Sequence, residues 1–91
     1  MPTISWFYGI AIRMWFNDHA PPHFHAYEQD NEAQVGIADG EIMHGRLSKG
    51  AQRLVKQWTE INRDALMTNW KAARPGSRKP LERIPGLDTP Q

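Results

Sequence analysis

Cysteine is absent from this chain of 91 residues, which excludes a disulfide framework, a thiolate metal site and a cysteine nucleophile. No apolar run approaches the roughly 20 residues that a membrane-spanning helix needs. The N-terminus lacks the basic and apolar regions of a signal peptide, and neither a glycine-rich phosphate loop nor a serine–histidine–acid arrangement is evident. We therefore expect a cytoplasmic protein with no membrane association, organised as one domain.

Net charge is also low, at +1, but the charges are unevenly distributed. Residues 1–47 carry two basic and six acidic residues, whereas residues 48–91 carry nine basic and four acidic residues. A basic half suits contact with nucleic acid or an acidic partner, although a solvated helix face is the simpler explanation. The candidate binding residues are Arg53, Lys56 and Lys71, together with Trp15 as a tryptophan outside the apolar face of its strand.

The chemistry of the sequence is concentrated in residues 18–27, which read DHAPPHFHAY. Three of the four histidines lie here, around a double proline that excludes helix at its centre. In an extended strand after the prolines, alternate side chains share a face, which places His23, His25 and Tyr27 together. The pattern predicts a rigid turn that leads into paired imidazoles.

Three interpretations of His19, His23 and His25 remain open. Imidazoles about 6.5 Å apart on one strand face can share a divalent metal ion, with His19 as a third ligand and Asp18 or a neighbouring strand completing the shell. Alternatively, the imidazoles act as general acid and base in phosphodiester cleavage without a cofactor. Tyr27 then donates a hydrogen bond, and Arg13, Arg46 or Lys49 neutralises a phosphate. In the third interpretation the rings bond neighbouring groups and only shape the turn.

The rest of the chain predicts an α+β fold, in which a small antiparallel meander of four to five strands is covered by a long amphipathic helix. Alternating or β-rich segments predict strands at residues 3–8, 10–16, 23–28, 32–37 and 41–45. Asp39-Gly40 is a signal for a type I′ hairpin turn. Residues 1–76 are expected to form the domain, and residues 77–91 an extended, loose tail.

One helix is predicted from about residue 49 to residue 73, with Ser48 as its N-cap. Apolar residues recur there at three- and four-residue spacing, which is typical of an amphipathic helix. The five-residue step from Ile61 to Leu66 rotates this stripe around the helix axis. We expect an irregularity at that point within a single helix, since neither glycine nor proline intervenes.

Several motifs carry a family resemblance: MPTIS at 1–5, FYGI at 7–10, FNDH at 16–19, PPHFH at 21–25, GEI at 40–42, and the helix with Trp58 and Asn69-Trp70. On these motifs the chain resembles, from residue 1 to about residue 76, a small bacterial family known as domain of unknown function 4160. Its members are often encoded beside a second small domain family, in an arrangement like a toxin–antitoxin pair.

The resemblance implies the toxin-like component of such a pair, with a small antitoxin-like partner protein and RNA as its target, or else the partner of the toxin. We expect the three neighbouring histidines to be its functional centre and the basic helix its contact surface. The alternative is a non-catalytic module that binds a small partner protein through exposed tryptophan and the tail.

Overall fold

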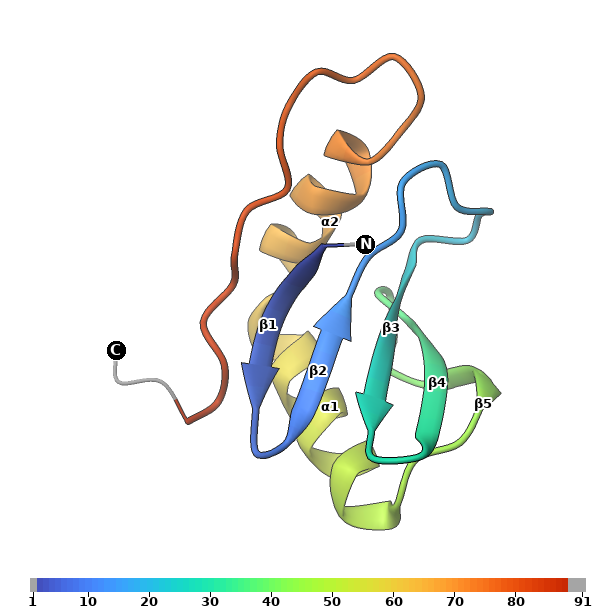
Figure 1. Cartoon of the computed structure of the whole chain (residues 1–91), viewed down its shortest axis with the longest axis vertical. Helices are drawn as coiled ribbons and strands as arrows, with labels where there is room; N and C mark the ends of the chain where they lie inside the picture. The colour runs from blue at the N-terminus through green and yellow to red at the C-terminus, as the bar shows by residue number, and fades with distance from the viewer. Residues whose placement is uncertain (1, 89–91) are drawn as a thin grey trace.

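The computed structural model describes residues 2–88 and contains one five-stranded antiparallel sheet followed by two helices (Figure 1). The elements are β1 (Thr3–Phe7), β2 (Ile10–Arg13), β3 (His23–Glu28), β4 (Asn31–Gly36), β5 (Ile42–Gly45), α1 (Lys49–Ile61) and α2 (Arg63–Ala72). The strands lie in the order of the sequence, so the predicted α+β meander is confirmed. Within the described residues, no helix combines the length and the apolar character needed to span a membrane.

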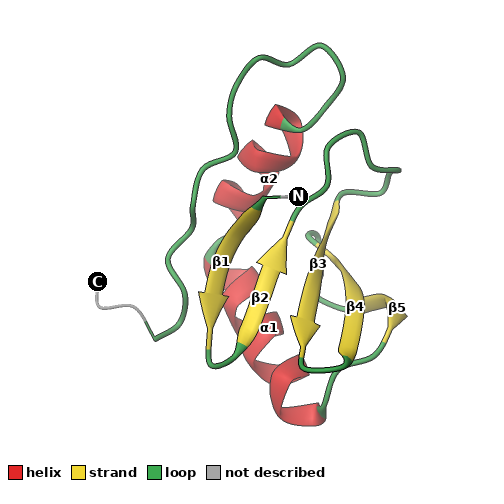
Figure 2. Cartoon of the chain, viewed as in Figure 1, coloured by secondary structure: helices red, strands yellow, loops and turns green. Residues whose placement is uncertain are grey.

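The helices cover one face of the sheet, which we call the core face (Figure 2). Its apolar side chains are fully buried, as the alternation of apolar residues predicts. Those of the three central strands are Ile10, Ile12, Phe24, Ala26, Ala33 and Val35. Trp58 of α1 packs against them, with its ring centroid 5.2 Å from that of Phe7 and 5.6 Å from that of Phe24. Removal of this apolar surface from water is the main stabilisation of the fold.

Strand β2 ends at Arg13, three residues before the predicted end. Beyond it the backbone leaves the sheet, because Asn17 adopts a left-handed conformation, with φ at 60°, and donates its N–H to the carbonyl of Ala73 at 2.9 Å. The predicted continuation of the strand, including Trp15, therefore lies in a loop attached to the end of α2.

The predicted type I′ turn at Asp39-Gly40 is wrong. Gly40 has a positive φ, of 70°, but Asp39 does not. The Asp39 carboxylate instead accepts the backbone N–H of Glu41 at 3.0 Å, and β4 and β5 are joined by a longer loop. A pair of left-handed residues occurs at Tyr8 and Gly9, with φ values of 50° and 77°, and these two residues join β1 to β2.

The predicted irregularity in the helix is confirmed, but the expected single helix is divided at Asn62 into two. The side-chain amide of Asn62 donates to the carbonyl of Trp58 at 2.9 Å, and its backbone, at φ −112° and ψ 21°, leaves the helical conformation. Asparagine favours such breaks because its side chain competes for backbone hydrogen bonds. The new direction allows Leu66 and Trp70 of α2 to be buried together with Trp58 of α1.

The segment after α2 is extended, as predicted, and returns alongside β1 (Figure 1). Ile84 is buried and donates its backbone N–H to the carbonyl of Ile4 at 2.7 Å. The buried side chain of Asn69 hydrogen-bonds both the N–H and the carbonyl of Glu82, at 2.9 and 2.8 Å. The tail predicted at 77–91 is thus attached to the domain over its described part, and residues 89–91 lie outside the described residues.

Candidate functional site: two histidines and an aspartate

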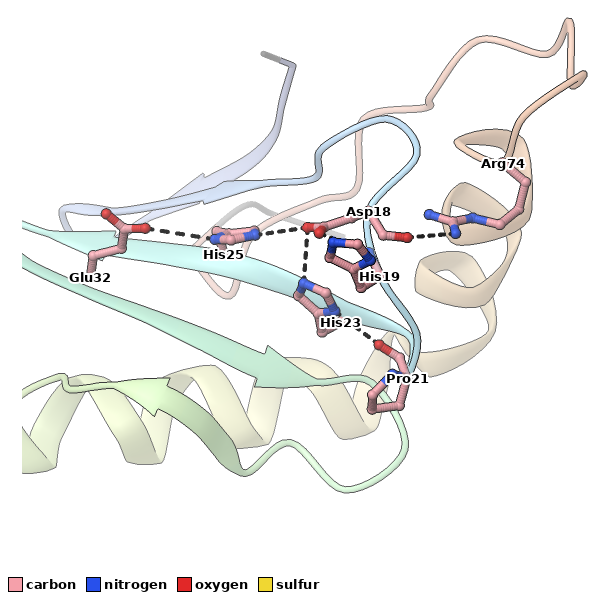
Figure 3. Close-up of polar contacts among 7 residues, drawn as sticks. All are labelled: Asp18, His19, Pro21, His23, His25, Glu32 and Arg74. Atoms are coloured by element: carbon pink, nitrogen blue, oxygen red, sulfur yellow. Dashed lines mark hydrogen bonds and ion pairs between the residues drawn. The ribbon is translucent and has the colours of Figure 1, made fainter.

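The candidate site lies where β2 leads into the loop of residues 14–22 and where β3 begins (Figure 3). The loop contains a cis peptide bond between Ala20 and Pro21. The loop places the carboxylate of Asp18 against His23 and His25, in the first half of β3. We call Asp18, His23 and His25 the histidine–aspartate cluster.

Both imidazole rings of the cluster face the same carboxylate oxygen. The Nε2 atoms of His23 and His25 lie 2.9 and 3.1 Å from Oδ2 of Asp18. The ring centroids are 5.3 Å apart, and one potential ligand atom from each of the three residues lies within 4.8 Å of the others. The predicted pairing of His23 and His25 on one strand face therefore brings the rings together in space.

The other nitrogen of each ring also faces an oxygen atom (Figure 3). Nδ1 of His23 lies 2.9 Å from the carbonyl oxygen of Pro21. Nδ1 of His25 lies 3.7 Å from a carboxylate oxygen of Glu32, is buried, and has no hydrogen-bond partner among the described residues. His23 is therefore held by contacts at both ring nitrogens, whereas His25 is held at Nε2 alone and only faces Glu32 with Nδ1.

Asp18 is held in its ionised form. Burial by itself would raise the pKa of Asp18, but hydrogen bonds from the His25 side chain and the His19 backbone, with the nearby His23, outweigh it and lower the pKa. The cluster therefore contains a carboxylate that is negatively charged at neutral pH and that both imidazole rings contact.

Aromatic side chains surround the rings, which are 4% exposed for His23 and 6% exposed for His25. The ring of Trp70, from the end of α2, lies 5.4 Å from that of His23. Trp15 meets His25 edge-on at 6.0 Å. The Asp18 side chain is 21% exposed, so solvent approaches the cluster on the side of the loop.

Arg74 connects the loop to the C-terminal end of α2. Its guanidinium lies 3.8 Å from the ring centroid of Trp70 and donates a 2.7 Å hydrogen bond to the backbone carbonyl of Asp18 (Figure 3). The sequence contains no signal that would identify this contact, because Arg74 and Asp18 are separated by 56 residues. The same applies to Glu32, whose position beside His25 depends on the pairing of β3 with β4.

Of the five predicted catalytic residues, the structure places His23 and His25 in the cluster and the other three outside it. His19 is exposed and contributes its backbone N–H to Asp18 at 2.9 Å, while its ring is not part of the cluster of three ligand atoms. Tyr27 lies on the same strand face as His25, with ring centroids 6.5 Å apart. Arg13 stacks over Tyr27 at 4.9 Å and bonds Thr3 at 3.2 Å. Burial, and then the negative charge of Glu32, raise the pKa of Tyr27 and keep its hydroxyl protonated.

The predicted binding residues of the helices are not brought to the histidines. Arg53 and Lys71 are exposed on α1 and α2, and neither forms one of the hydrogen bonds or ring contacts of His23 and His25 within residues 2–88. Lys56 pairs with Glu41 at 2.6 Å. The basic helix surface and the histidine–aspartate cluster are therefore separate features, and only Trp15 among the predicted binding residues contacts the cluster.

A family model described as "Domain of unknown function (DUF4160)" matches residues 9–71, which confirms the resemblance of the motifs. No curated protein and no solved structure matches the chain.

Proposed function

We propose a toxin-like role for this chain, which belongs to the DUF4160 family of domains of unknown function. In this proposal it works in the bacterial cytoplasm as one half of a two-protein module, is restrained by a small antitoxin-like protein, and acts on RNA. The observation that carries the proposal is the convergence of two imidazoles on one ionised carboxylate beneath a solvent-facing loop. These groups are suited to proton transfer or metal-assisted hydrolysis of a phosphodiester.

Access to the cluster decides which groups meet the substrate. Both His23 and His25 are buried with their Nε2 atoms directed at Asp18, whereas His19 is exposed beside it. We assign proton exchange with the substrate to the His19 ring. Asp18, His23 and His25 form the charged centre beneath it.

The test is induced expression of the chain and of single-site variants, with growth as the readout. The wild type and His44→Ala, a control at an exposed histidine of β5, should both arrest growth. His19→Ala and the double variant His23→Ala/His25→Ala should not. A folded double variant that arrests growth as strongly as the wild type would remove the cluster from the mechanism. Purified protein incubated with RNA then tests whether RNA is the target.

A second candidate function is a non-catalytic module that binds a small partner protein, and exposed aromatic residues favour it. Trp6 lies across from Ala11 and Tyr27 on the face of the sheet opposite the helices and is 59% exposed, and Trp15 is 40% exposed. A stable one-to-one complex with the product of the neighbouring gene, weakened by Trp6→Ser and accompanied by no RNA cleavage, would support this function. RNA cleavage that depends on the cluster would reject it.

A further inference from the structure

We propose that the histidine–aspartate cluster binds one divalent transition-metal ion of the Zn²⁺ class, through Nε2 of His23, Nε2 of His25 and Oδ2 of Asp18. The site is the one discussed above, but metal binding is inferred from its geometry and does not depend on RNA as the target. Two imidazoles and one carboxylate form a ligand set that suits Zn²⁺, Co²⁺ or Fe²⁺, whereas Mg²⁺ prefers oxygen ligands alone.

The positions of the ligand atoms fit one shared ion. Ligands of a tetrahedral ion with bond lengths of 2.0–2.1 Å lie roughly 3.3 Å apart. The two Nε2 atoms lie 2.9 and 3.1 Å from the carboxylate oxygen, and no pair in the set exceeds 4.8 Å. Small shifts of the rings would therefore accommodate an ion, with no change in the course of the backbone.

The contacts of His23 favour an ion between its Nε2 atom and Asp18. The carbonyl of Pro21 can only accept a hydrogen bond, so Nδ1 of His23 carries a proton and donates it. A neutral ring then has a lone pair on Nε2, and this lone pair faces Oδ2 of the Asp18 carboxyl group at 2.9 Å. A proton or a metal ion between these two atoms relieves the contact of their lone pairs. A metal ion satisfies His23, Asp18 and His25 together.

His25 provides an independent observation, because its buried Nδ1 has no hydrogen-bond partner among residues 2–88. If the proton of the neutral ring is on Nε2 and bonds Asp18, Nδ1 is left as a bare acceptor that faces the carboxylate of Glu32 at 3.7 Å. Metal at Nε2 moves the proton to Nδ1, from which it can be donated to Glu32. Histidines that bind a metal through one ring nitrogen commonly donate the N–H of the other to a carboxylate in this way.

The surroundings of the cluster keep the ligands in place. Trp70 and Trp15 pack beside the two rings, and Arg74 attaches the backbone of Asp18 to the end of α2. Three protein ligands leave a coordination position for water or substrate, as in catalytic rather than structural zinc sites. The site is therefore built to hold an ion that remains accessible from the loop.

Titration calorimetry of chelator-treated protein with Zn²⁺ tests the proposal, with Mg²⁺ as the contrasting ion and the Co²⁺ visible spectrum as a report on the ligands. We expect one Zn²⁺ per chain and no heat with Mg²⁺. Asp18→Asn and His25→Gln should each weaken Zn²⁺ binding by more than roughly 100-fold, and Glu32→Gln by roughly 10- to 100-fold. The matched control His44→Gln should bind like the wild type.

Absence of Zn²⁺ binding by the wild type, or an equal loss in His44→Gln and Asp18→Asn, would overturn the proposal. If the histidine variants do not fold, ¹⁵N spectra of the wild-type imidazole rings replace them: Zn²⁺ should shift both Nε2 signals, and unchanged signals would reject the site. Zn²⁺ binding without RNA cleavage or toxicity would reject the toxin-like function alone, and cleavage by metal-free protein would reject a role for the ion.

Discussion

The two faces of the sheet are both buried at β3, but by different means. On the core face, Phe24 and Ala26 are covered by apolar side chains from the helices. On the opposite face, which we call the open face, His23 and His25 are covered by one loop and by two tryptophan rings. Successive residues of β3 therefore alternate between a polar cluster on the open face and a close-packed apolar core on the core face.

The difference shows that burial on the open face depends on few contacts. The core face is held by many apolar contacts, each weak and together strong. The loop over the histidines is joined to the end of α2 by two hydrogen bonds, from Arg74 to the carbonyl of Asp18 and from the Asn17 N–H to the carbonyl of Ala73. We expect the core face to control folding stability, and the loop to control access to the cluster and its affinity for ligands.

The largest expected effect is the loss of a core aromatic ring. Phe24→Ala should lower the free energy of unfolding by about 3–5 kcal/mol, because a fully buried ring leaves a cavity. Trp6→Ala removes a larger but mainly exposed ring of the open face and should cost about 0.5 kcal/mol or less. Urea denaturation of both variants measures the difference. Similar losses in the two variants would contradict the contrast between the faces.

A smaller effect on stability, but a larger one on the site, is expected for Arg74→Met. The substitution keeps apolar contact with Trp70 and removes the guanidinium's hydrogen bonds to the carbonyls of Asp18 and Trp70. Loss of the shorter bond, to Asp18, should cost about 1.5–3 kcal/mol because the donor is charged. Zn²⁺ affinity should fall by roughly 10-fold or more, as for other residues that orient ligands. Calorimetry and urea denaturation measure the two quantities.

Arg78→Met, at an exposed position of the tail, is the matched control for Arg74→Met. It should change neither stability nor Zn²⁺ affinity. A loss of stability in Arg74→Met without any change in affinity would show that Arg74 supports the fold and does not position the loop.

The contrast between the faces also explains what the sequence could predict. Alternation along β3 is enough to predict the pairing of His23 with His25 on one face, because strand geometry determines it locally. Both rings contact one oxygen of Asp18, and this depends on the path of the loop. The position of Glu32 beside His25 depends on the pairing of β3 with β4. No periodic pattern encodes either.

The helix break illustrates the same limit. The step from Ile61 to Leu66 indicated that the apolar stripe rotates, and the structure confirms an irregularity in that region. It takes the form of a full break because the side chain of Asn62 bonds the carbonyl of Trp58. Propensity alone does not decide between a bend and a break, since the outcome depends on where the two helices pack.

The smallest expected effect concerns Glu28, at the exposed end of the core face, where β3 is joined to the start of α1. Its carboxylate accepts the backbone N–H of Ser48 at 3.0 Å and the Ser48 hydroxyl at 2.7 Å, and the same hydroxyl accepts the N–H of Ala51 in the first turn of α1. The Ser48 backbone N–H, and then its hydroxyl, lower the pKa of Glu28. Because the folded pKa is the lower one, this stabilisation is complete above the unfolded value of about 4.3 and is lost as the pH falls through the folded value.

Glu28→Gln should therefore be slightly less stable than the wild type at pH 6, by less than about 1 kcal/mol because the contact is exposed. The difference should shrink as the pH is lowered from 5 to 3, since the wild-type carboxylate is protonated there. Urea denaturation midpoints at pH 6 and pH 3 measure this difference in stability. The control is Glu60→Gln, which makes the same change of charge at an exposed position of α1. If Glu60→Gln reproduces the pH response of Glu28→Gln, net charge and not the contact with Ser48 is responsible. The stability of the core face then depends on its apolar residues and not on this contact.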